Sequence, residues 1–323
     1  MGVADLVFGR LADGELVIID GGMGSQLQAE GVPMDEVAWS ARANLDQRDV
    51  VQRVHEAYIR AGAEVIIANT FAASRAALEP AGLGSRVADA NRSAVGAALR
   101  ARDAAATRPV AVAGSMSSFC PAVMEGGYQD APLTRPASEE NHFPGLADYR
   151  EQAQLLAEAG AELIVLEMIE APGYGRAALR AAAETGLPVW LGISAARRPD
   201  GTLSTFTELG GGDSFEDLLR ALADPSLAAV TVMHSSPEVI LDAIEIIRGH
   251  FAGPIGAYAE TGGWVPPNWV FDGLPPGEYL QHAIAWADRG AQLIGGCCGT
   301  GPEHIRALAD RMAGHSTPPD QEI

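Results

Sequence analysis

The chain has 323 residues, and its 22 basic and 42 acidic side chains give a formal net charge of −20. A field that negative argues against nucleic acid and anionic membranes as partners. Apolar residues make up 47% of the chain, which is enough to bury a large core, and the length suits one α/β barrel.

The first residues, MGVADLVFGR, lack a basic start followed by a long apolar run, so we expect no secretory signal. We find no apolar run long enough to span a membrane. The 3 cysteines, two of them adjacent, do not make a disulfide framework. We therefore expect a cytoplasmic protein.

Eight apolar runs follow one another along the chain and predict β-strands. Their residues are mostly apolar rather than alternating, which is typical of parallel strands covered on both faces. The runs cover residues 16–20, 64–69, 109–115, 162–168, 188–194, 228–234, 254–260 and 291–298.

Segments with helical spacing of apolar residues lie between these runs, at 46–62, 84–104, 146–160, 173–186, 214–223, 236–249 and 277–290. Strand-then-helix units with short returns predict an α/β fold, a single-domain (β/α)8 TIM barrel over residues 1–313. An open doubly wound sheet is the alternative. The irregular stretch 117–144 is interpreted as a lid over the barrel mouth, and residues 314–323 as a disordered tail.

The active site of such a barrel lies at the C-terminal ends of its strands. Every predicted strand end carries a polar side chain or a thiol. These residues are Asp20, Asn69, Ser115, Glu167, Ser194, His234, Glu260 and the pair Cys297–Cys298. Chance would scatter such residues along the strands, so the pattern predicts a site at this mouth.

The adjacent thiols of Cys297 and Cys298 indicate a metal site. Neighbouring strand residues face opposite sides, so both thiols can reach one ion only where regular strand geometry has ended, and the flanking glycines give that freedom. Two thiolates suit Zn²⁺, which binds sulfur at about 2.3 Å in a tetrahedral site. Two inert buried cysteines or a strained vicinal disulfide are the alternatives.

A third metal ligand has to come from another part of the chain. The candidates are His234, at the end of the sixth predicted strand, and Cys120, in the presumed lid. A lid is a poor place for a rigid ligand, so we favour His234. A histidine at a strand end can equally be a hydrogen-bonding residue.

The sequence resembles the homocysteine S-methyltransferase family, which includes betaine- and S-methylmethionine-dependent enzymes. DGGMGS (20–25), Trp39-Ser40, HEAY (55–58) and ANTF (68–71) are similar to family motifs, and Glu167 falls where the family has the glutamate of its E-T motif. LIGGCCGT (293–300), followed by Pro302, His304 and Ile305, is close to the family's I-G-G-C-C-x-T-x-P-x-H-I.

The resemblance implies methyl transfer from a sulfonium or quaternary ammonium donor to the thiol of homocysteine or a related thiol. It also implies a Zn²⁺ that lowers the pKa of that thiol. Asp20 and Glu167 match residues that hold the amino group of homocysteine, and we assign both as catalytic and substrate-binding; capping of the following segment is the alternative for each. The further predicted substrate-binding residues are Gly21, Met23, Trp39, Asn69, Phe71, Ser194 and Glu260.

Three departures from the family pattern surround one predicted pocket. The family's sixth strand ends in Asn-Cys, with that cysteine as a zinc ligand, whereas this chain has Met233-His234. The seventh strand of the family reads Y-P/A-N-x-G, and Glu260 replaces the asparagine. The G-P-Y/L-G pattern after Gly114-Ser115 is missing. We hypothesise a zinc held by His234, Cys297 and Cys298, with an acceptor that differs from homocysteine.

Three functions therefore stay open: methyl transfer to homocysteine or a close thiol, a catabolic methyl transfer to another acceptor, and a small-molecule-binding barrel that has lost zinc. Aromatic side chains near the predicted mouth, at Trp39, Phe71, Trp264 and Trp269, could surround a cationic methyl donor. The sequence leaves open the donor, the acceptor and whether identical chains form a homo-oligomer.

Overall fold

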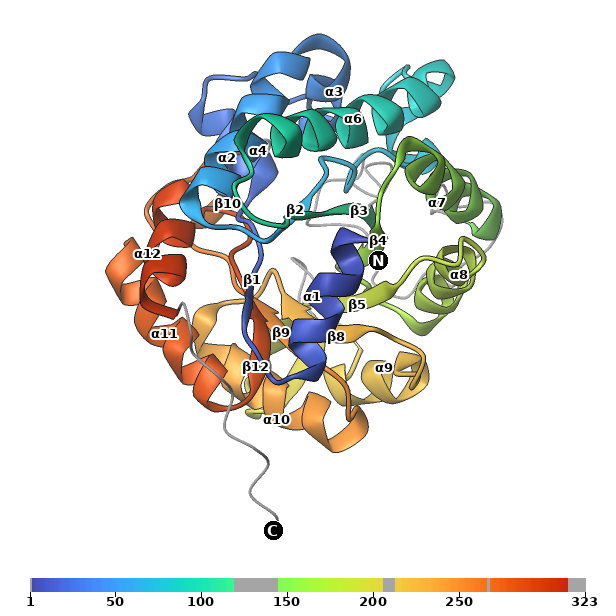
Figure 1. The fold of residues 1–323 in the computed structure, drawn as a ribbon. Coiled ribbons are helices and arrows are strands. Elements are labelled where there is room, and N and C mark those ends of the chain that lie inside the picture. Colours follow the sequence, from blue (N-terminus) through green and yellow to red (C-terminus); the bar gives the residue numbers. More distant parts are fainter. Residues whose placement is uncertain (1, 119–144, 206–212, 266–267, 313–323) are drawn as a thin grey trace.

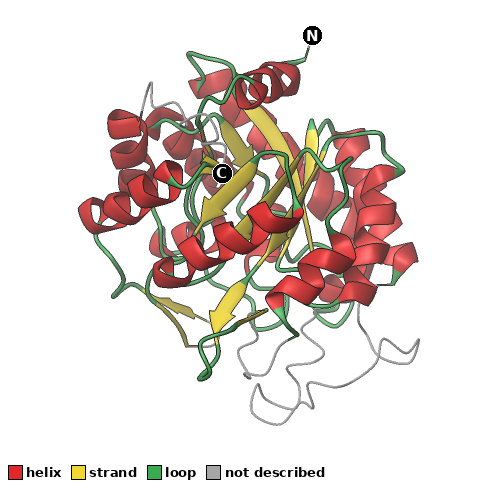
Figure 2. Cartoon of the chain, turned by 90° about the horizontal axis from the view of Figure 1, so that it is seen from below, coloured by secondary structure: helices red, strands yellow, loops and turns green. Residues whose placement is uncertain are grey.

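The computed structural model describes residues 2–118, 145–205, 213–265 and 268–312. Eight parallel strands form one curved sheet inside a layer of helices (Figures 1 and 2). The order β1-β12-β9-β8-β5-β4-β3-β2 places sequence neighbours side by side, and a parallel bridge between Ile19 and Val65 joins the two ends. The predicted TIM barrel is confirmed, and the open doubly wound sheet is excluded.

All eight predicted strands are present. They are β1 Val17–Ile18, β2 Val65–Ile67, β3 Ala111–Ser117, β4 Leu163–Glu167, β5 Val189–Ile193, β8 Ala229–Met233, β9 Ile255–Tyr258 and β12 Ala291–Ile294. Several predicted strand ends differ from the structure, and two of these differences change where predicted site residues lie. β12 stops at Ile294, so the cysteine pair lies in the turn beyond it, and β3 continues to Ser117, so Ser115 lies inside the strand.

The helices that follow the strands cover the outside of the barrel. They are α4 Arg48–Ala61, α6 Val87–Ala105, α7 Leu146–Ala159, α8 Pro172–Ala183, α9 Phe215–Leu222, α10 Ile240–His250, α11 Pro276–Asp288 and α12 Pro302–Met312. Each buries an apolar stripe against the sheet or its neighbours; in α4 this stripe includes Val51, Val54 and Tyr58. All seven predicted helices are present, and α12 adds the eighth.

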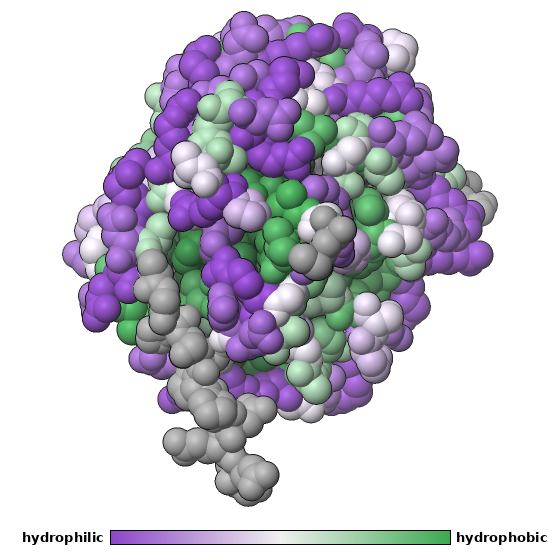
Figure 3. Space-filling model, viewed as in Figure 1, coloured by the Kyte–Doolittle hydropathy of each residue, from purple (hydrophilic) through white to green (hydrophobic). Residues whose placement is uncertain are grey.

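The helix α1 (Val3–Ala12), which the sequence reading missed, lies across the N-terminal end of the barrel (Figure 1). Val7 and Leu11 of this helix join the buried cluster inside the barrel, together with Val65 and Leu163. Figure 3 shows this face of the molecule, where hydrophobic residues gather around the middle and hydrophilic residues around the edge. The helix thus covers the end of the barrel opposite the predicted site.

Shorter elements surround the C-terminal ends of the strands. They are α2 Met23–Ala29, α3 Ala43–Asp46, α5 Arg75–Leu78, and two antiparallel hairpins, β6 Ala195–Arg197 with β7 Leu203–Thr205 and β10 Gly263–Val265 with β11 Asn268–Val270. Most of the presumed lid, Cys120 and the predicted tail lie outside the described residues. No helix in the described ranges combines the length and apolarity that crossing a membrane requires.

His55 on α4 gives the fold an expected acid sensitivity. Its ring is buried, neither ring nitrogen has a hydrogen-bond partner within the described structure, and burial lowers its pKa to about 3. The unfolded chain therefore takes up a proton on this side chain below about pH 6.5, whereas the folded chain does not until about pH 3. The free energy of unfolding should fall as the pH falls through this window.

Between about pH 7.5 and about pH 4.5, we expect the free energy of unfolding to fall by about 3 kcal/mol more in the wild type than in His55→Leu. Urea unfolding of both proteins at the two pH values measures this difference. Equal losses in wild type and variant would show that His55 is not the source of the acid sensitivity.

Candidate active site

A pocket lies at the C-terminal ends of the barrel strands, where the sequence predicted a site. Ten predicted site residues line it: Asp20, Gly21, Met23, Trp39, Asn69, Phe71, Glu167, His234, Cys297 and Cys298. Ser194 and Glu260 are outside the lining. The Ser194 side chain is fully buried, whereas Glu260 lies against His234.

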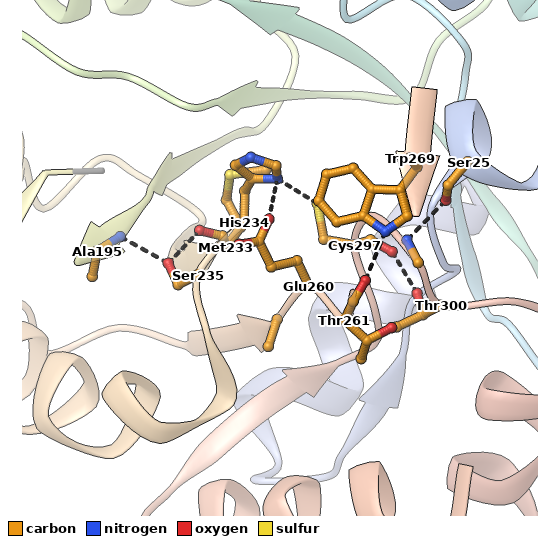
Figure 4. Close-up of polar contacts among 12 residues, drawn as sticks. Ser25, Ala195, Met233, His234, Ser235, Glu260, Thr261, Trp269, Cys297 and Thr300 are labelled. Carbon is orange, nitrogen blue, oxygen red and sulfur yellow. Dashed lines mark hydrogen bonds and ion pairs between the residues drawn. The ribbon is translucent and has the colours of Figure 1, made fainter. Parts of the chain in front are cut away.

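Three potential metal ligands converge in this pocket. The Nδ1 or Nε2 of His234 and the Sγ atoms of Cys297 and Cys298 lie within 4.8 Å of one another, and His234 Nδ1 is 3.6 Å from Cys297 Sγ (Figure 4). His234 follows β8 directly, and the cysteines lie in the turn after β12. These residues form the one such His/Cys/Asp/Glu cluster found in the described parts of the chain.

The turn with the two cysteines is held in place by hydrogen bonds to the loop after β1. Thr300 Oγ1 donates to Cys297 O (2.6 Å), and Gly22 N donates to Thr300 O (3.1 Å). Tyr58 OH lies 3.1 Å from Gly22 O and 3.0 Å from Thr300 O. The backbone that carries the thiols is therefore fixed relative to the loop that carries Asp20.

The thiols lie in surroundings that disfavour a free thiolate. The neighbouring Cys298 thiol and burial raise the pKa of Cys297 well above its ordinary value, and His234 offsets only part of this effect. A thiolate at this position therefore needs a cation beside it. Such a pair of thiols suits a soft or borderline metal ion.

Glu260 places a carboxylate beside the same imidazole. Its Oε2 is 3.0 Å from His234 Nδ1 (Figure 4), and both side chains are largely buried. The cysteine and histidine cluster therefore has a neighbouring negative charge from the end of β9. The sequence predicted Glu260 as a substrate-binding residue, and the structure puts it in contact with a potential metal ligand.

Two buried carboxylates form the second feature of the pocket. Asp20 Oδ2 accepts a hydrogen bond from Ile67 N (2.8 Å), while Glu167 accepts bonds from Ser115 Oγ and from Tyr258 OH (3.3 Å). Burial raises the pKa of Asp20 well above its ordinary range, and the charge of Glu167 adds to this rise. Burial also raises the pKa of Glu167, although its two donors lower it in part.

The described lining of the pocket contains acidic side chains but no arginine or lysine. Two buried carboxylates without a basic partner are costly, and a bound cation lowers that cost. The pocket is therefore suited to a ligand with an ammonium or similar group.

Strained backbone marks the same pocket. Trp39, Met168 and His234 have positive φ angles of 45°, 49° and 43°, and they are the non-glycine residues with positive φ in the described structure. All three line the pocket. Such conformations persist only where the surroundings impose them, and they cluster at functional sites.

Asn69 lines the pocket, but its side chain is bonded to protein. Its Nδ2 donates to Ser40 O and Asn44 Oδ1, each at 2.9 Å, and its Oδ1 accepts from Ser40 Oγ at 2.9 Å. Asn44 Nδ2 donates back to Asn69 O (2.7 Å). This network fixes the segment that begins with the strained Trp39, so Asn69 holds the pocket wall.

We expect Asn69→Asp to lower the free energy of unfolding by about 2 kcal/mol, because it removes two buried donors and sets a carboxylate against two acceptors. Chemical unfolding of the two proteins at neutral pH measures the change. A variant as stable as the wild type would show that the network does not hold this segment.

Several residues of the pocket lining were not predicted as site residues, among them Tyr258 and Met168. Tyr258, at the end of β9, donates to Glu167, and Met168 follows Glu167 in the left-handed conformation. A tyrosine hydroxyl near the end of an otherwise apolar strand is a signal that could have found the first; nothing in the sequence signals the second. Trp269, considered earlier for its aromatic ring, lines the pocket, whereas the side chain of Trp264 lies outside what is described.

Comparison with known proteins gives consistent matches over most of the chain. The family model described as homocysteine S-methyltransferase matches residues 17–312. Homocysteine S-methyltransferase 1 of Zea mays is 30% identical over 98% of this chain and 99% of that protein. A selenocysteine methyltransferase of Astragalus bisulcatus is 26% identical over 94% and 95%.

A solved structure shares the fold. The metallated form of the homocysteine methyltransferase MmuM from Escherichia coli superposes with a TM-score of 0.74 at 22% identity, over 94% of this chain and 98% of that chain. This likeness supports the barrel architecture.

Proposed function

Since the chain belongs to the homocysteine S-methyltransferase family and is a methyltransferase, we propose that it uses zinc to move a methyl group from a sulfonium or quaternary ammonium donor to the thiol of homocysteine or a related thiol. One observation carries this proposal: the cluster of His234, Cys297 and Cys298 shares a pocket with the buried carboxylates of Asp20 and Glu167.

The spacing of one pair of these ligand side chains suits a zinc ion. With Zn–S near 2.3 Å and Zn–N near 2.0–2.1 Å, tetrahedral geometry requires about 3.6 Å between a sulfur and a nitrogen ligand. The distance between Cys297 Sγ and His234 Nδ1 is 3.6 Å. A catalytic zinc has three protein ligands and one position for substrate, and His234, Cys297 and Cys298 would supply those three.

When bound, zinc would attract the acceptor sulfur and lower its pKa, so that the sulfur reacts as a thiolate. The remaining work belongs to the protein. Asp20 and Glu167 hold the ammonium group of the acceptor, which fixes the direction of its side chain toward the cysteines. Ser115 and Tyr258 orient the Glu167 carboxylate through their hydrogen bonds.

The methyl transfer is a single displacement. The acceptor thiol releases its proton to solvent, and the resulting sulfur forms a bond to the methyl carbon. As that bond forms, the bond from the methyl carbon to the donor sulfonium or ammonium breaks, and its electron pair stays on the donor atom, which becomes neutral. The methyl group passes directly from donor to acceptor, so no protein side chain has to carry it. The protein contributes in-line placement of the two substrates and a wall of apolar and aromatic side chains, including Trp39, Phe71 and Trp269.

The test is a methyl-transfer assay of the purified chain with homocysteine and a panel of donors: S-methylmethionine, S-adenosylmethionine, betaine and dimethylsulfoniopropionate. Zinc content is measured in parallel, and we expect about one ion per chain. A chain that contains no zinc and gives no methylated thiol with any donor would contradict the proposal.

Two substitutions favour a second candidate, an acceptor other than homocysteine. His234 and Glu260 replace residues that the family pattern has as cysteine and asparagine, and they lie in contact with each other at the metal cluster. Acceptor specificity is therefore tested with a second panel of thiols under the best donor. A higher kcat/KM for another thiol than for homocysteine would support this candidate.

A further inference from the structure

The hairpin β10–β11 follows the seventh barrel strand and turns the side chain of Trp269 inward. Its surface side chains are exposed: Val265 is 61% exposed, and Phe271, just after the hairpin, is 53% exposed. Trp269 lies between exposed neighbours in β11 and is only 5% exposed. Among the described side chains of the hairpin, the Trp269 indole is the one that is buried.

Hydrogen bonds anchor Trp269 from two sides. Gln28 of α2 pairs with its backbone, since Gln28 Nε2 donates to Trp269 O (2.8 Å) and Trp269 N donates to Gln28 Oε1 (2.7 Å). The indole Nε1 donates to Thr261 O (2.7 Å), and Thr261 N donates to Cys298 O (2.8 Å). A short chain of hydrogen bonds thus links the indole to the turn with the thiols. Figure 4 shows its first bond, from Trp269 to Thr261.

The indole also packs closely against that turn. A Cβ atom added at Gly299 would lie 2.7 Å from Trp269 Nε1, closer than side chains approach. The ring centroid is 6.1 Å from that of His234, with the planes at 56°. Trp269 lines the pocket together with His234, Cys297 and Cys298. It is therefore an apolar wall directly beside the three potential ligands.

We propose that Trp269, held in place by Gln28, is a positioning residue that keeps water away from the open corner of the metal site, so that the substrate sulfur fills this corner. This role rests on the proposed function, because it requires a metal ion at His234, Cys297 and Cys298. The physical basis is the exclusion of water by a rigid ring, which also strengthens the attraction between the ion and the incoming sulfur.

Cobalt in place of zinc gives a direct view of this corner, since its visible absorption depends on coordination number. The variants are Trp269→Ala, Trp269→Phe and Gln28→Leu, with Gln26→Leu on the same helix as the matched control. With the thiol acceptor added, we expect Trp269→Ala to bind cobalt in the same amount as wild type but to show a weaker sulfur-to-cobalt absorption, because water then competes with the acceptor sulfur for the open corner.

The same variant should raise the KM for the thiol by about 10- to 100-fold, the range for residues that support metal ligands, with a smaller change in kcat. Trp269→Phe and Gln28→Leu should fall between Trp269→Ala and wild type, which keeps the test valid if the alanine variant unfolds. Gln26→Leu should match wild type.

The proposal is overturned if Trp269→Ala and Gln28→Leu bind cobalt with the wild-type spectrum and the wild-type KM for the thiol. Failure of the proposed function looks different, because the unmodified chain would then bind no cobalt and transfer no methyl group.

Discussion

Replacing His234 by alanine is expected to remove most of the bound zinc and to lower methyl transfer by about a thousandfold or more. A metal ion that stabilises developing charge contributes several kcal/mol, and each 1.4 kcal/mol corresponds to a factor of ten in rate. With two thiols left, the site has one ligand fewer than a catalytic zinc normally has. Metal analysis of the purified variant and kcat/KM for the thiol measure the two effects.

The control for this prediction is His234→Cys, because a thiolate is also a zinc ligand. We expect this variant to keep its metal, unlike His234→Ala. Full zinc retention in His234→Ala would show that the imidazole is not a ligand, and the proposed mechanism would then be wrong. A wild type without zinc would have the same consequence.

The neighbouring carboxylate adds a second expectation for His234→Cys. Two thiolates and a neutral imidazole leave a zinc site with no formal charge, and Glu260, with Oε2 3.0 Å from His234 Nδ1, adds one negative charge beside it. A third thiolate would put its charge against Glu260. We therefore expect His234→Cys to have low activity and the double variant His234→Cys/Glu260→Asn to recover part of it.

The barrel could be predicted because its information is local. Each strand is a short apolar run, and each predicted helix shows the 3.6-residue period, so that pattern and chain order alone identify the topology. The helix α1 was missed although Ala4, Val7 and Leu11 are spaced as in an amphipathic helix. This helix precedes the first barrel strand, so the strand-then-helix order that identifies the other helices does not indicate it.

The site could be predicted only in part, because strand ends indicate where a residue lies but not what its side chain contacts. Asp20, Glu167, His234 and the two cysteines line the pocket as expected. Asn69 lines it too, yet its amide is bonded to Ser40 and Asn44. Ser194 follows a strand as the others do, but it is buried outside the lining. Residue type alone does not tell which polar side chains are available to a ligand. That depends on whether a neighbouring residue already forms hydrogen bonds with the side chain.

The left-handed backbone of His234 is another feature that sequence does not reveal. Its φ of 43° directs the side chain after β8 has ended. Histidine adopts positive φ more often than most residues, but still only in a small minority of cases, so its presence in a sequence does not predict this conformation. The conformation is imposed by the surrounding structure, which includes the hydrogen bonds from Ala195 N to Ser235 Oγ (2.7 Å) and from Ser235 Oγ to Met233 O (2.6 Å). The first of these bonds joins residues 40 apart in the sequence, so it cannot be inferred from the local pattern around His234.

Replacing Glu167 by glutamine is expected to raise the KM for the thiol acceptor by about 100-fold. Removing one charge from a buried, hydrogen-bonded ion pair costs several kcal/mol in affinity. The glutamine keeps the size of the side chain and can still bond to Ser115 and Tyr258, so the fold should be retained. Steady-state kinetics at saturating donor measure the change, and Glu162→Gln just before β4 is the matched control.

The pH dependence of the same variant identifies the cause. The ammonium group of the acceptor is held by ionised carboxylates, so kcat/KM should fall as the pH falls through their pKa values. Burial raises the pKa of both Asp20 and Glu167, and the charge of Glu167 raises that of Asp20 further. The acid limb of the wild type should therefore lie above the ordinary carboxylate range of about 4. In Glu167→Gln the remaining carboxylate, Asp20, loses its negative neighbour, so its pKa falls and the acid limb moves to lower pH. An acid limb that stays in place or moves to higher pH would show that the two carboxylates do not bind the acceptor as a pair.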